Sequence, residues 1–254
     1  MLKKRLIFTL LYQDENFYLS RNFKLQKVGN LQWLKKNYNF SLIAKSIDEL
    51  IILNVSRNKN DIKKFTDTIK KVIENCFIPV SVGGKITHLD VAKKYIDAGA
   101  DKLVVNSNLF DLSLIDKIAK TYGEQSLIGS LDYKKKNKDF IFFSHNGDKK
   151  INLNLNKIFT ILQNLHIGEI ILNSIDKDGT GFGLDFDILK KIPKKMNKPI
   201  IYSGGSGNHL HILEGFKKKN LSAIATANLL NFVGNGLLFT RNELLKYGIK
   251  LAKW

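Results

Sequence analysis

The sequence has one cysteine, three prolines and no long hydrophobic run, and each scarcity excludes a class of protein. Because Cys76 is the only cysteine, no disulfide can form within the chain, and a reducing, cytoplasmic setting is expected. No apolar stretch approaches the roughly 18 residues that a membrane-spanning helix needs, so no membrane association is expected. With 44% hydrophobic residues and few prolines, the chain can bury a sizeable core.

The first residues are basic and then apolar, as in a signal peptide. Gln13, Asp14 and Glu15 interrupt the apolar stretch, and no small-residue cleavage site follows. A first β-strand is therefore the better interpretation.

Acidic residues are too few to balance the basic ones, and the formal net charge is +18. Such a field attracts phosphate-bearing ligands, nucleic acid or an acidic protein. The lysines, however, occur in pairs and triplets such as residues 217–219, which is typical of solvated helix faces and of biased codon usage. No aromatic-interleaved basic motif, helix-turn-helix or zinc pattern accompanies them, so nucleic-acid binding is not expected.

Short apolar runs alternate with longer amphipathic stretches, which is typical of βα units around a parallel sheet. Eight runs predict strands at residues 6–11, 50–55, 80–82, 102–106, 127–132, 169–174, 200–203 and 223–226. The stretches between them predict helices at residues 62–74, 89–98, 113–122, 155–165, 186–196 and 210–218. A closed (β/α)8 TIM barrel needs about 250 residues, so the sequence predicts a single α/β domain over residues 1–254.

Three segments of the chain recur in its second half at nearly one spacing. Residues 49–53, 79–84 and 10–12 resemble residues 169–173, 199–205 and 131–133, which begin 120 or 121 positions later. Any one similarity between short apolar strands arises easily by chance, but three at one offset favour duplication. The barrel is therefore expected to consist of two (β/α)4 halves, roughly residues 1–122 and 123–254, with strands one and five as counterparts.

Two strand ends carry paired glycines. In such barrels the active site lies at the C-terminal ends of the strands, and glycine lets the backbone and the next helix start approach a phosphate. The pairs Gly83-Gly84 and Gly204-Gly205, the latter flanked by Ser203 and Ser206, therefore predict two phosphate sites facing each other across the barrel mouth. The alternative is two tight turns without a ligand.

Carboxylates stand at the ends of strands five and six. Asp132 is well placed for proton transfer, and Asp178 lies in an Asp-x-Asp-Gly-Thr segment that could instead be a polar turn. The later ligands of a calcium loop are missing from that segment. The counterpart of Asp132 in the first half is Leu11, and strand two ends in Asn54, so neither offers a carboxylate for acid–base work. Of the two predicted halves, only the second therefore supplies carboxylates for acid–base chemistry.

The remaining ionisable residues give no metal or nucleophile pattern. His209 and His211 face different sides of a helix, which excludes shared metal ligation. His88, His145 and His166 stand alone in the sequence, and no Ser–His–Asp or Cys–His arrangement is evident. We therefore expect neither a metal nor a cofactor.

Residues 1–10, 77–106, 169–178 and 199–232 resemble the cyclase subunit of imidazole glycerol phosphate synthase, the HisF family, and the resemblance runs along essentially the whole chain. It implies a lyase-type cyclase of histidine biosynthesis. In that family, ammonia comes from a HisH-like glutaminase docked on the lower barrel face. The ammonia then reacts at the upper face with a substrate that carries two phosphates.

Carried over residue by residue, the resemblance holds at some functional positions and fails at others. It assigns the second catalytic aspartate to Asp132, the Asp-Gly-Thr loop to Asp178, Gly179 and Thr180, and positions near the phosphates to Asn106 and Gly205. The first catalytic aspartate falls on Leu11, a loop lysine on Leu19, an aspartate on Asn54 and a glycine on Lys85. Loss of a general acid or base alone removes about 10²–10⁴ in rate, so whether ring closure survives is left open.

The lower face keeps its charges. The resemblance assigns the family's ammonia gate to Arg5, Glu49, Lys102 and Glu169, and a glutaminase-facing position to Asp101. Such a ring could also be purely structural, closing the core against water.

The leading hypothesis is a second-copy HisF-like subunit that forms a heterodimer with a glutaminase and passes ammonia up its barrel. Paralogues of this kind accompany sugar amidotransferases, where the nitrogen becomes an amidino group of a surface-glycan sugar. One alternative is an authentic cyclase of histidine biosynthesis in which Asp132 or Asp178 covers both proton roles. The other is a non-catalytic, phosphate-responsive scaffold for the glutaminase.

Overall fold

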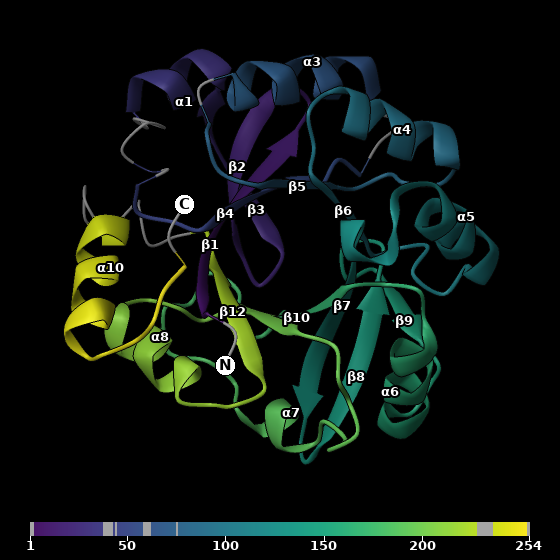
Figure 1. Cartoon of the computed structure of the whole chain (residues 1–254), viewed down its shortest axis with the longest axis vertical. Helices are drawn as coiled ribbons and strands as arrows, with labels where there is room; N and C mark the ends of the chain where they lie inside the picture. The colour runs from purple at the N-terminus through teal and green to yellow at the C-terminus, as the bar shows by residue number, and fades with distance from the viewer. Residues whose placement is uncertain are drawn as a thin grey trace.

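The computed structural model describes residues 3–37, 43, 45–57, 62–74, 76–227 and 236–252. Eight parallel strands close into a barrel (Figure 1). Strand β1 pairs on one side with β4 and on the other with β12, and β7 pairs directly with β10, so the ring has no open edge. The strands are β1 (Arg5–Gln13), β4 (Glu49–Asn54), β5 (Val80–Gly83), β6 (Lys102–Val105), β7 (Leu127–Lys136), β10 (Glu169–Ser174), β11 (Ile200–Ser203) and β12 (Leu221–Thr226). The predicted TIM barrel is confirmed.

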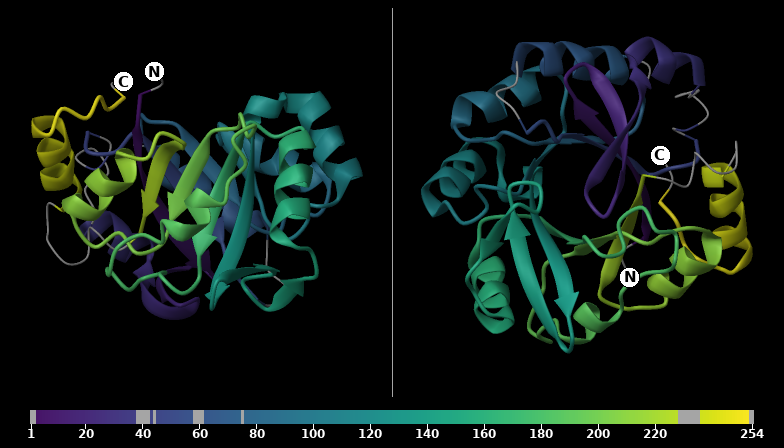
Figure 2. Two further views of the ribbon diagram at one scale, coloured as in Figure 1. Left: turned by 90° about the horizontal axis from the view of Figure 1, so that it is seen from below. Right: turned by 180° about the vertical axis from the view of Figure 1, so that it is seen from behind.

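Helices surround the barrel (Figures 1 and 2). Local signals explain where they form: in α5, for example, Asp111 caps the start by accepting from the Leu114 N–H at 3.1 Å, and Gly123 at φ 87° ends the helix. The helices are α1 (Leu31–Asn37), α3 (Ile62–Ile73), α4 (Leu89–Asp97), α5 (Leu112–Tyr122), α6 (Leu155–Asn164), α7 (Asp187–Lys190), α8 (His209–Phe216) and α10 (Gly236–Lys246), with a 3-10 turn at Glu124–Ser126. None of the described helices is both long and apolar enough to cross a membrane.

The helix predicted over residues 186–196 is wrong in length, because α7 ends at Lys190. Pro193 explains the early end. Proline lacks an N–H for the helical ladder, and its ring disfavours the helical conformation at Ile192.

Two hairpins that the sequence analysis did not predict extend from the barrel mouth. After β1 come β2 (Asn16–Arg21) and β3 (Lys24–Asn30), and after β7 come β8 (Asp139–Ser144) and β9 (Lys149–Ile151). They project on the same side, away from the labelled chain ends (Figure 2). The two strands predicted to be counterparts, β1 and β7, are thus each followed by an antiparallel hairpin.

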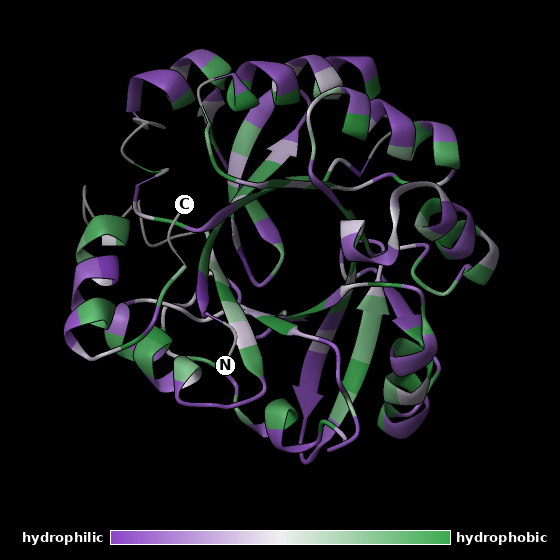
Figure 3. Cartoon of the chain, in the orientation of Figure 1, coloured by the Kyte–Doolittle hydropathy of each residue, from purple (hydrophilic) through white to green (hydrophobic). Residues whose placement is uncertain are grey.

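The hydrophobic core has two parts. The larger lies between the strands and the helices, whose residues alternate between hydrophobic and hydrophilic (Figure 3). The smaller fills the middle of the barrel with the side chains of Ile7, Ile51, Val104, Ile128, Ile171, Ile201, Ala223 and Ala225. This apolar layer separates the lower end of the barrel from its upper mouth.

We predict that Ile128→Ala lowers the free energy of unfolding by about 2–5 kcal/mol, because Ile128 is fully buried in the barrel interior and the truncation leaves a cavity. Urea denaturation measures the change. The matched control is Leu112→Ala, which truncates a side chain that is 57% exposed and should change stability by less than about 1 kcal/mol. Equal losses in the two variants would contradict this description of the core.

Candidate functional site

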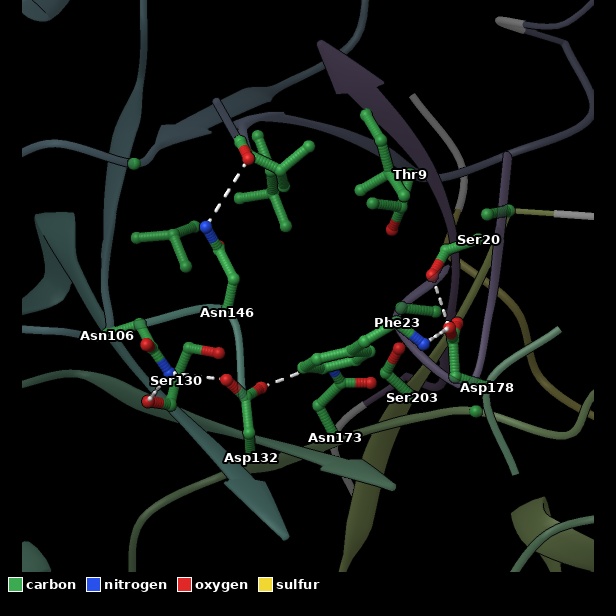
Figure 4. A pocket seen from close by; sticks show the side chains of 18 of the residues that line it. Thr9, Ser20, Phe23, Asn106, Ser130, Asp132, Asn146, Asn173, Asp178 and Ser203 are labelled. Carbon is green, nitrogen blue, oxygen red and sulfur yellow. Dashed lines mark hydrogen bonds between the residues drawn. The ribbon is translucent and has the colours of Figure 1, made fainter. Parts of the chain in front are cut away.

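A cavity of about 560 Å³ opens at the C-terminal ends of the strands (Figure 4). Most of the predicted upper-face residues line it: Leu11, Gly84, Asn106, Asp132, Asp178, Ser203, Gly204 and Gly205. Gly83 does not. It is buried, and a Cβ there would lie 2.6 Å from the Val104 carbonyl oxygen, so close packing between strands accounts for this glycine.

Asp132, on β7, is the most deeply buried carboxylate of the cavity, with 5% of its surface exposed. The side-chain amides of Asn106 and Asn173 each donate to one of its oxygens at 3.0 Å (Figure 4). Burial raises the pKa of Asp132 to about 7, against the two hydrogen bonds that favour the charged form and with a small further contribution from the charge of Asp178. Such a group can both take and give a proton near neutral pH.

Asp178 also lines the cavity, but its carboxylate is hydrogen-bonded to residues at the β2–β3 turn. The Ser20 hydroxyl and the Phe23 N–H donate to its Oδ2 at 2.5 and 3.0 Å (Figure 4). Burial raises the pKa of Asp178 above its usual range, although both hydrogen bonds oppose the shift. Asp178 therefore anchors the first hairpin across the mouth, a contact that spans 155 or more positions of sequence.

The first half of the barrel offers an apolar wall instead of a carboxylate. Leu11 and Leu53 are paired in register on β1 and β4, and both line the cavity together with Leu25 and Val55. Asn54 is 4% exposed, and its Oδ1 accepts from the Ser56 N–H at 3.1 Å. Its Nδ2 is buried without a hydrogen-bond partner among the described residues. An orphaned buried donor of this kind is costly unless a ligand or water meets it.

Both glycine turns adopt backbone conformations that require glycine. Gly84 and Gly205 have φ of 94° and 91°, and a Cβ on either would lie 2.1 Å from a carbonyl oxygen. The buried Ser206 hydroxyl lines the cavity without a partner among the described residues, close before α8. Lys85, at the position where the resemblance implied a third glycine, adopts φ 58°. The exposed backbone N–H groups of such turns suit an anionic ligand.

At the opposite end of the barrel four charged side chains form a closed, alternating ring. Arg5 contacts Glu49 at 2.9 Å and Glu169 more closely, and Lys102 contacts the same two carboxylates at 3.3 and 2.8 Å. Ser81 donates a further hydrogen bond to Glu49 at 2.5 Å. Burial opposes the charge on Glu169, yet Arg5 and then Lys102 outweigh it and hold the pKa of this carboxyl below its usual value.

Asp101, beside Lys102 of this ring, is exposed, and its side chain accepts from the Val80 N–H at 2.8 Å. The sequence analysis missed Asp48, which is fully buried at the same end and pairs with Arg241 at 2.9 Å. No spacing in the sequence links these two residues.

A family model described as "Histidine biosynthesis protein" matches residues 34–233. The "Putative imidazole glycerol phosphate synthase subunit hisF2" of Parasynechococcus marenigrum (strain WH8102) is 43% identical over 100% of this chain and 95% of its own. The "Imidazole glycerol phosphate synthase subunit HisF" of Pelodictyon phaeoclathratiforme (strain DSM 5477 / BU-1) is 35% identical over 98% of both chains, and that of Chlorobium phaeobacteroides (strain BS1) is 33% identical over 99% of both.

The chain belongs to the HisF family.

In this HisF family member, several residues of the cavity had escaped the sequence analysis. Arg57, His145, Asn146 and Asp148 line it from the loop after β4 and from the β8–β9 turn, and Asn173 lines it from β10. The residues of the β8–β9 turn were missed because that hairpin was not predicted, whereas Arg57 and Asn173 belong to no motif that the sequence analysis recognised. Among the described residues no group of three or more His, Cys, Asp or Glu side chains is arranged to hold a metal ion.

We predict that Asp132 makes stability depend on pH. The native pKa of about 7 lies above the ordinary 3.8, so the folded chain binds this proton more tightly than the unfolded chain. The stability that Asp132 contributes is therefore present below about pH 4 and is lost as the pH rises to about 7. Asp132→Asn cannot titrate, so its free energy of unfolding relative to wild type should rise by a few kcal/mol, on the order of 1.4 kcal/mol per pKa unit, across this window.

Urea denaturation at intervals between pH 4 and pH 8 measures the difference. If the free energies of unfolding of Asp132→Asn and wild type differ by the same amount at every pH, the carboxyl of Asp132 has an ordinary pKa. The variant Asp139→Asn, at the exposed start of β8, is the control.

Proposed function

We propose that this HisF family member receives ammonia from a glutaminase docked on its lower face and passes it through the barrel to a phosphorylated acceptor in the upper cavity. One observation carries the proposal: the charged ring at the strand starts is complete, whereas the upper cavity has lost the carboxylate at Leu11. The lower face has what an ammonia gate needs, and the upper face departs from what ring closure needs.

Stability alone is a weak reason for the ring. Glu49 has only 2% of its side chain exposed, and its charge is balanced by Arg5 and Lys102. Replacing a buried ion pair by apolar side chains of similar volume is often neutral or stabilising. A chain that needed only a closed barrel bottom could therefore have used hydrophobic residues, and four alternating charges at this position support a gate.

The apolar layer above the ring suits neutral ammonia. Ile7, Ile51 and Ile171 contribute to it, and β12 adds only the small side chains of Ala223 and Ala225. An ammonium ion would lose its hydration there without a compensating partner, at a large cost. Neutral ammonia loses far less, so the layer favours the form that can act as a nucleophile.

The acceptor is expected to differ from the substrate of histidine biosynthesis. Closing an imidazole ring with one carboxylate from each half requires a carboxylate at position 11 as well as at position 132. Position 11 is a leucine, and β1 contains no acidic residue. The glycine turns, the buried Ser206 hydroxyl and the orphaned Asn54 amide still support a phosphorylated ligand. We propose that the nitrogen becomes an amidino group of a surface-glycan sugar through a sugar amidotransferase; the hisF2 name of the relative at 43% identity supports a second-copy role.

One observation favours a second candidate, an authentic cyclase of histidine biosynthesis. Asp178 lines the same cavity as Asp132, and burial raises its pKa as well. If the β2–β3 turn released it, Asp178 would supply a second proton-transferring carboxylate.

The two functions are separated by the variant Leu11→Asp. We predict that wild type, given ammonium and the ribulosyl substrate of imidazole glycerol phosphate synthase, turns over at least about 100-fold more slowly than a Chlorobium HisF, and that Leu11→Asp raises the rate by about 10-fold or more because it restores a carboxylate opposite Asp132. The rate of product formation is measured at saturating ammonium.

Leu53→Asp is the matched control, because it adds a carboxylate to the same wall in register with position 11. It should leave the rate unchanged. A wild-type rate within about ten-fold of that HisF would overturn the proposal in favour of the authentic cyclase.

A further inference from the structure

Among the described residues that line the cavity, His145 is the single histidine. It begins the β8–β9 turn, in which His145, Asn146 and Gly147 have φ of 54°, 57° and 82°. Histidine and asparagine are among the few residues that tolerate this left-handed region. The Asp148 N–H donates to the His145 carbonyl at 3.1 Å, which closes a tight turn and fixes the backbone that carries the imidazole.

Contacts with the first half of the barrel hold this turn in place. The Asn146 side-chain amide donates to the Val55 carbonyl at 3.3 Å (Figure 4), and Arg57 pairs with Asp148 at 3.4 Å. Gly147 sits against the β2–β3 turn, where a Cβ would lie 2.9 Å from the ring of Phe23. Since Val55 directly follows Asn54, a turn of the second half is fastened to the wall that lacks a carboxylate.

The imidazole itself is oriented by a buried neighbour. The Ser144 hydroxyl lies 2.9 Å from His145 Nδ1, and Ser144 is only 6% exposed. A hydroxyl can either donate to Nδ1 or accept from it, so the ring can carry its proton on either nitrogen. Nε2 is the nitrogen that remains for a ligand, and among the described residues nothing bonds to it. A group that both gives and takes a proton needs this arrangement.

We propose that His145, which lines the same cavity as Asp132, transfers protons to and from the bound acceptor in place of the acid that Leu11 cannot supply. The proposal rests on the proposed function. As ammonia adds to the carbonyl carbon of a phosphorylated acceptor, a C–N bond forms and the C=O π pair moves to oxygen. That oxygen takes the Nε2 proton of the imidazolium form of His145, whose Nδ1–H then donates to the Ser144 hydroxyl, so the ring is left as neutral imidazole. The Asp132 carboxylate takes a proton from the new ammonium nitrogen, so the step is redox-neutral and needs only ammonia as co-reactant.

The other charged groups that line the cavity set the background for any pH dependence. Arg57 and Asp148 neutralise each other beside His145, and Ser144 is a positioning residue. The remaining charged groups are Lys85, Asp132 and Asp178.

The test uses the chain in complex with its glutaminase. We expect His145→Gln to lower kcat for ammonia transfer by about 30-fold or more with KM changed less than about 3-fold, and to flatten one limb of the pH–rate profile. Ser144→Ala should move that limb and cost less. The matched control His88→Gln replaces an exposed histidine that lies outside the cavity and should behave as wild type. A loss below about 3-fold in His145→Gln overturns the proposal and leaves the proposed function standing.

A second measurement does not depend on turnover. Histidine ring NMR signals of the wild-type chain are recorded during titration with ribose 5-phosphate, and those of His145 are assigned with His145→Gln. We expect the His145 signal to shift and its protonation midpoint to move by about half a pH unit or more, while His88 and His166 stay unchanged. If the complex shows no ammonia transfer, the proposed function fails and this titration alone decides. A His145 midpoint that the sugar phosphate leaves unmoved overturns the inference.

Discussion

Closure of the barrel is the constraint on which every other feature depends. Once β1 is hydrogen-bonded to both β4 and β12, alternate side chains of all eight strands must point into one interior and stack in layers. The first layer is charged, the second is apolar, and the third is the polar and apolar lining of the cavity. Arg5, Ile7 and Leu11 on one strand belong to these three layers, so a single strand connects the charged ring to the cavity.

The two hairpins exchange contacts between the halves. The turn of the first hairpin is held by Asp178, which follows β10 in the second half. The turn of the second hairpin is held by Val55 and Arg57, which follow β4 in the first half. The two turns meet where Gly147 faces Phe23. Hairpins thus follow β1 and β7 alike, and the two strands differ in the side chain that lines the cavity, Asp132 on β7 and Leu11 on β1.

The sequence allowed the barrel strands and most of the site to be predicted, because both depend on local patterns. Apolar runs mark buried parallel strands, and paired glycines mark turns where φ must be positive, as at Gly84 and Gly205. The turns from β1 into β2 and from β7 into β8 were not predicted because they use Asp14, Glu15 and Asn137 in the left-handed region, where a glycine would have been the signal. The β8–β9 turn does contain such a signal, Asn146-Gly147, which the sequence analysis did not use. The hydrogen bonds from Ser20 to Asp178 and from Asn146 to the Val55 carbonyl join residues that only the closed barrel brings together. His145, which stands alone in the sequence, gains its partner Ser144 from that turn geometry.

The charged ring and the cavity lie at opposite ends of one barrel, and they differ in how closely their residues follow the family resemblance. The charged ring retains all four members, and the Asp132 carboxylate keeps two amide donors, yet the wall opposite it is built of Leu11 and Leu53. The proposed delivery of ammonia depends on the charged ring and on the apolar layer above it, whereas the nature of the proposed acceptor depends on the cavity wall.

The most direct test of ammonia delivery is isotope competition in the complex with the glutaminase. Glutamine labelled with 15N in its amide is supplied together with a large excess of unlabelled ammonium, and the 15N content of the aminated product is measured by mass spectrometry. If the barrel conducts ammonia, the product nitrogen comes predominantly from glutamine despite the excess in solution. A product labelled only in proportion to the 15N content of the free ammonium pool would contradict the account, because the nitrogen would then have passed through bulk water.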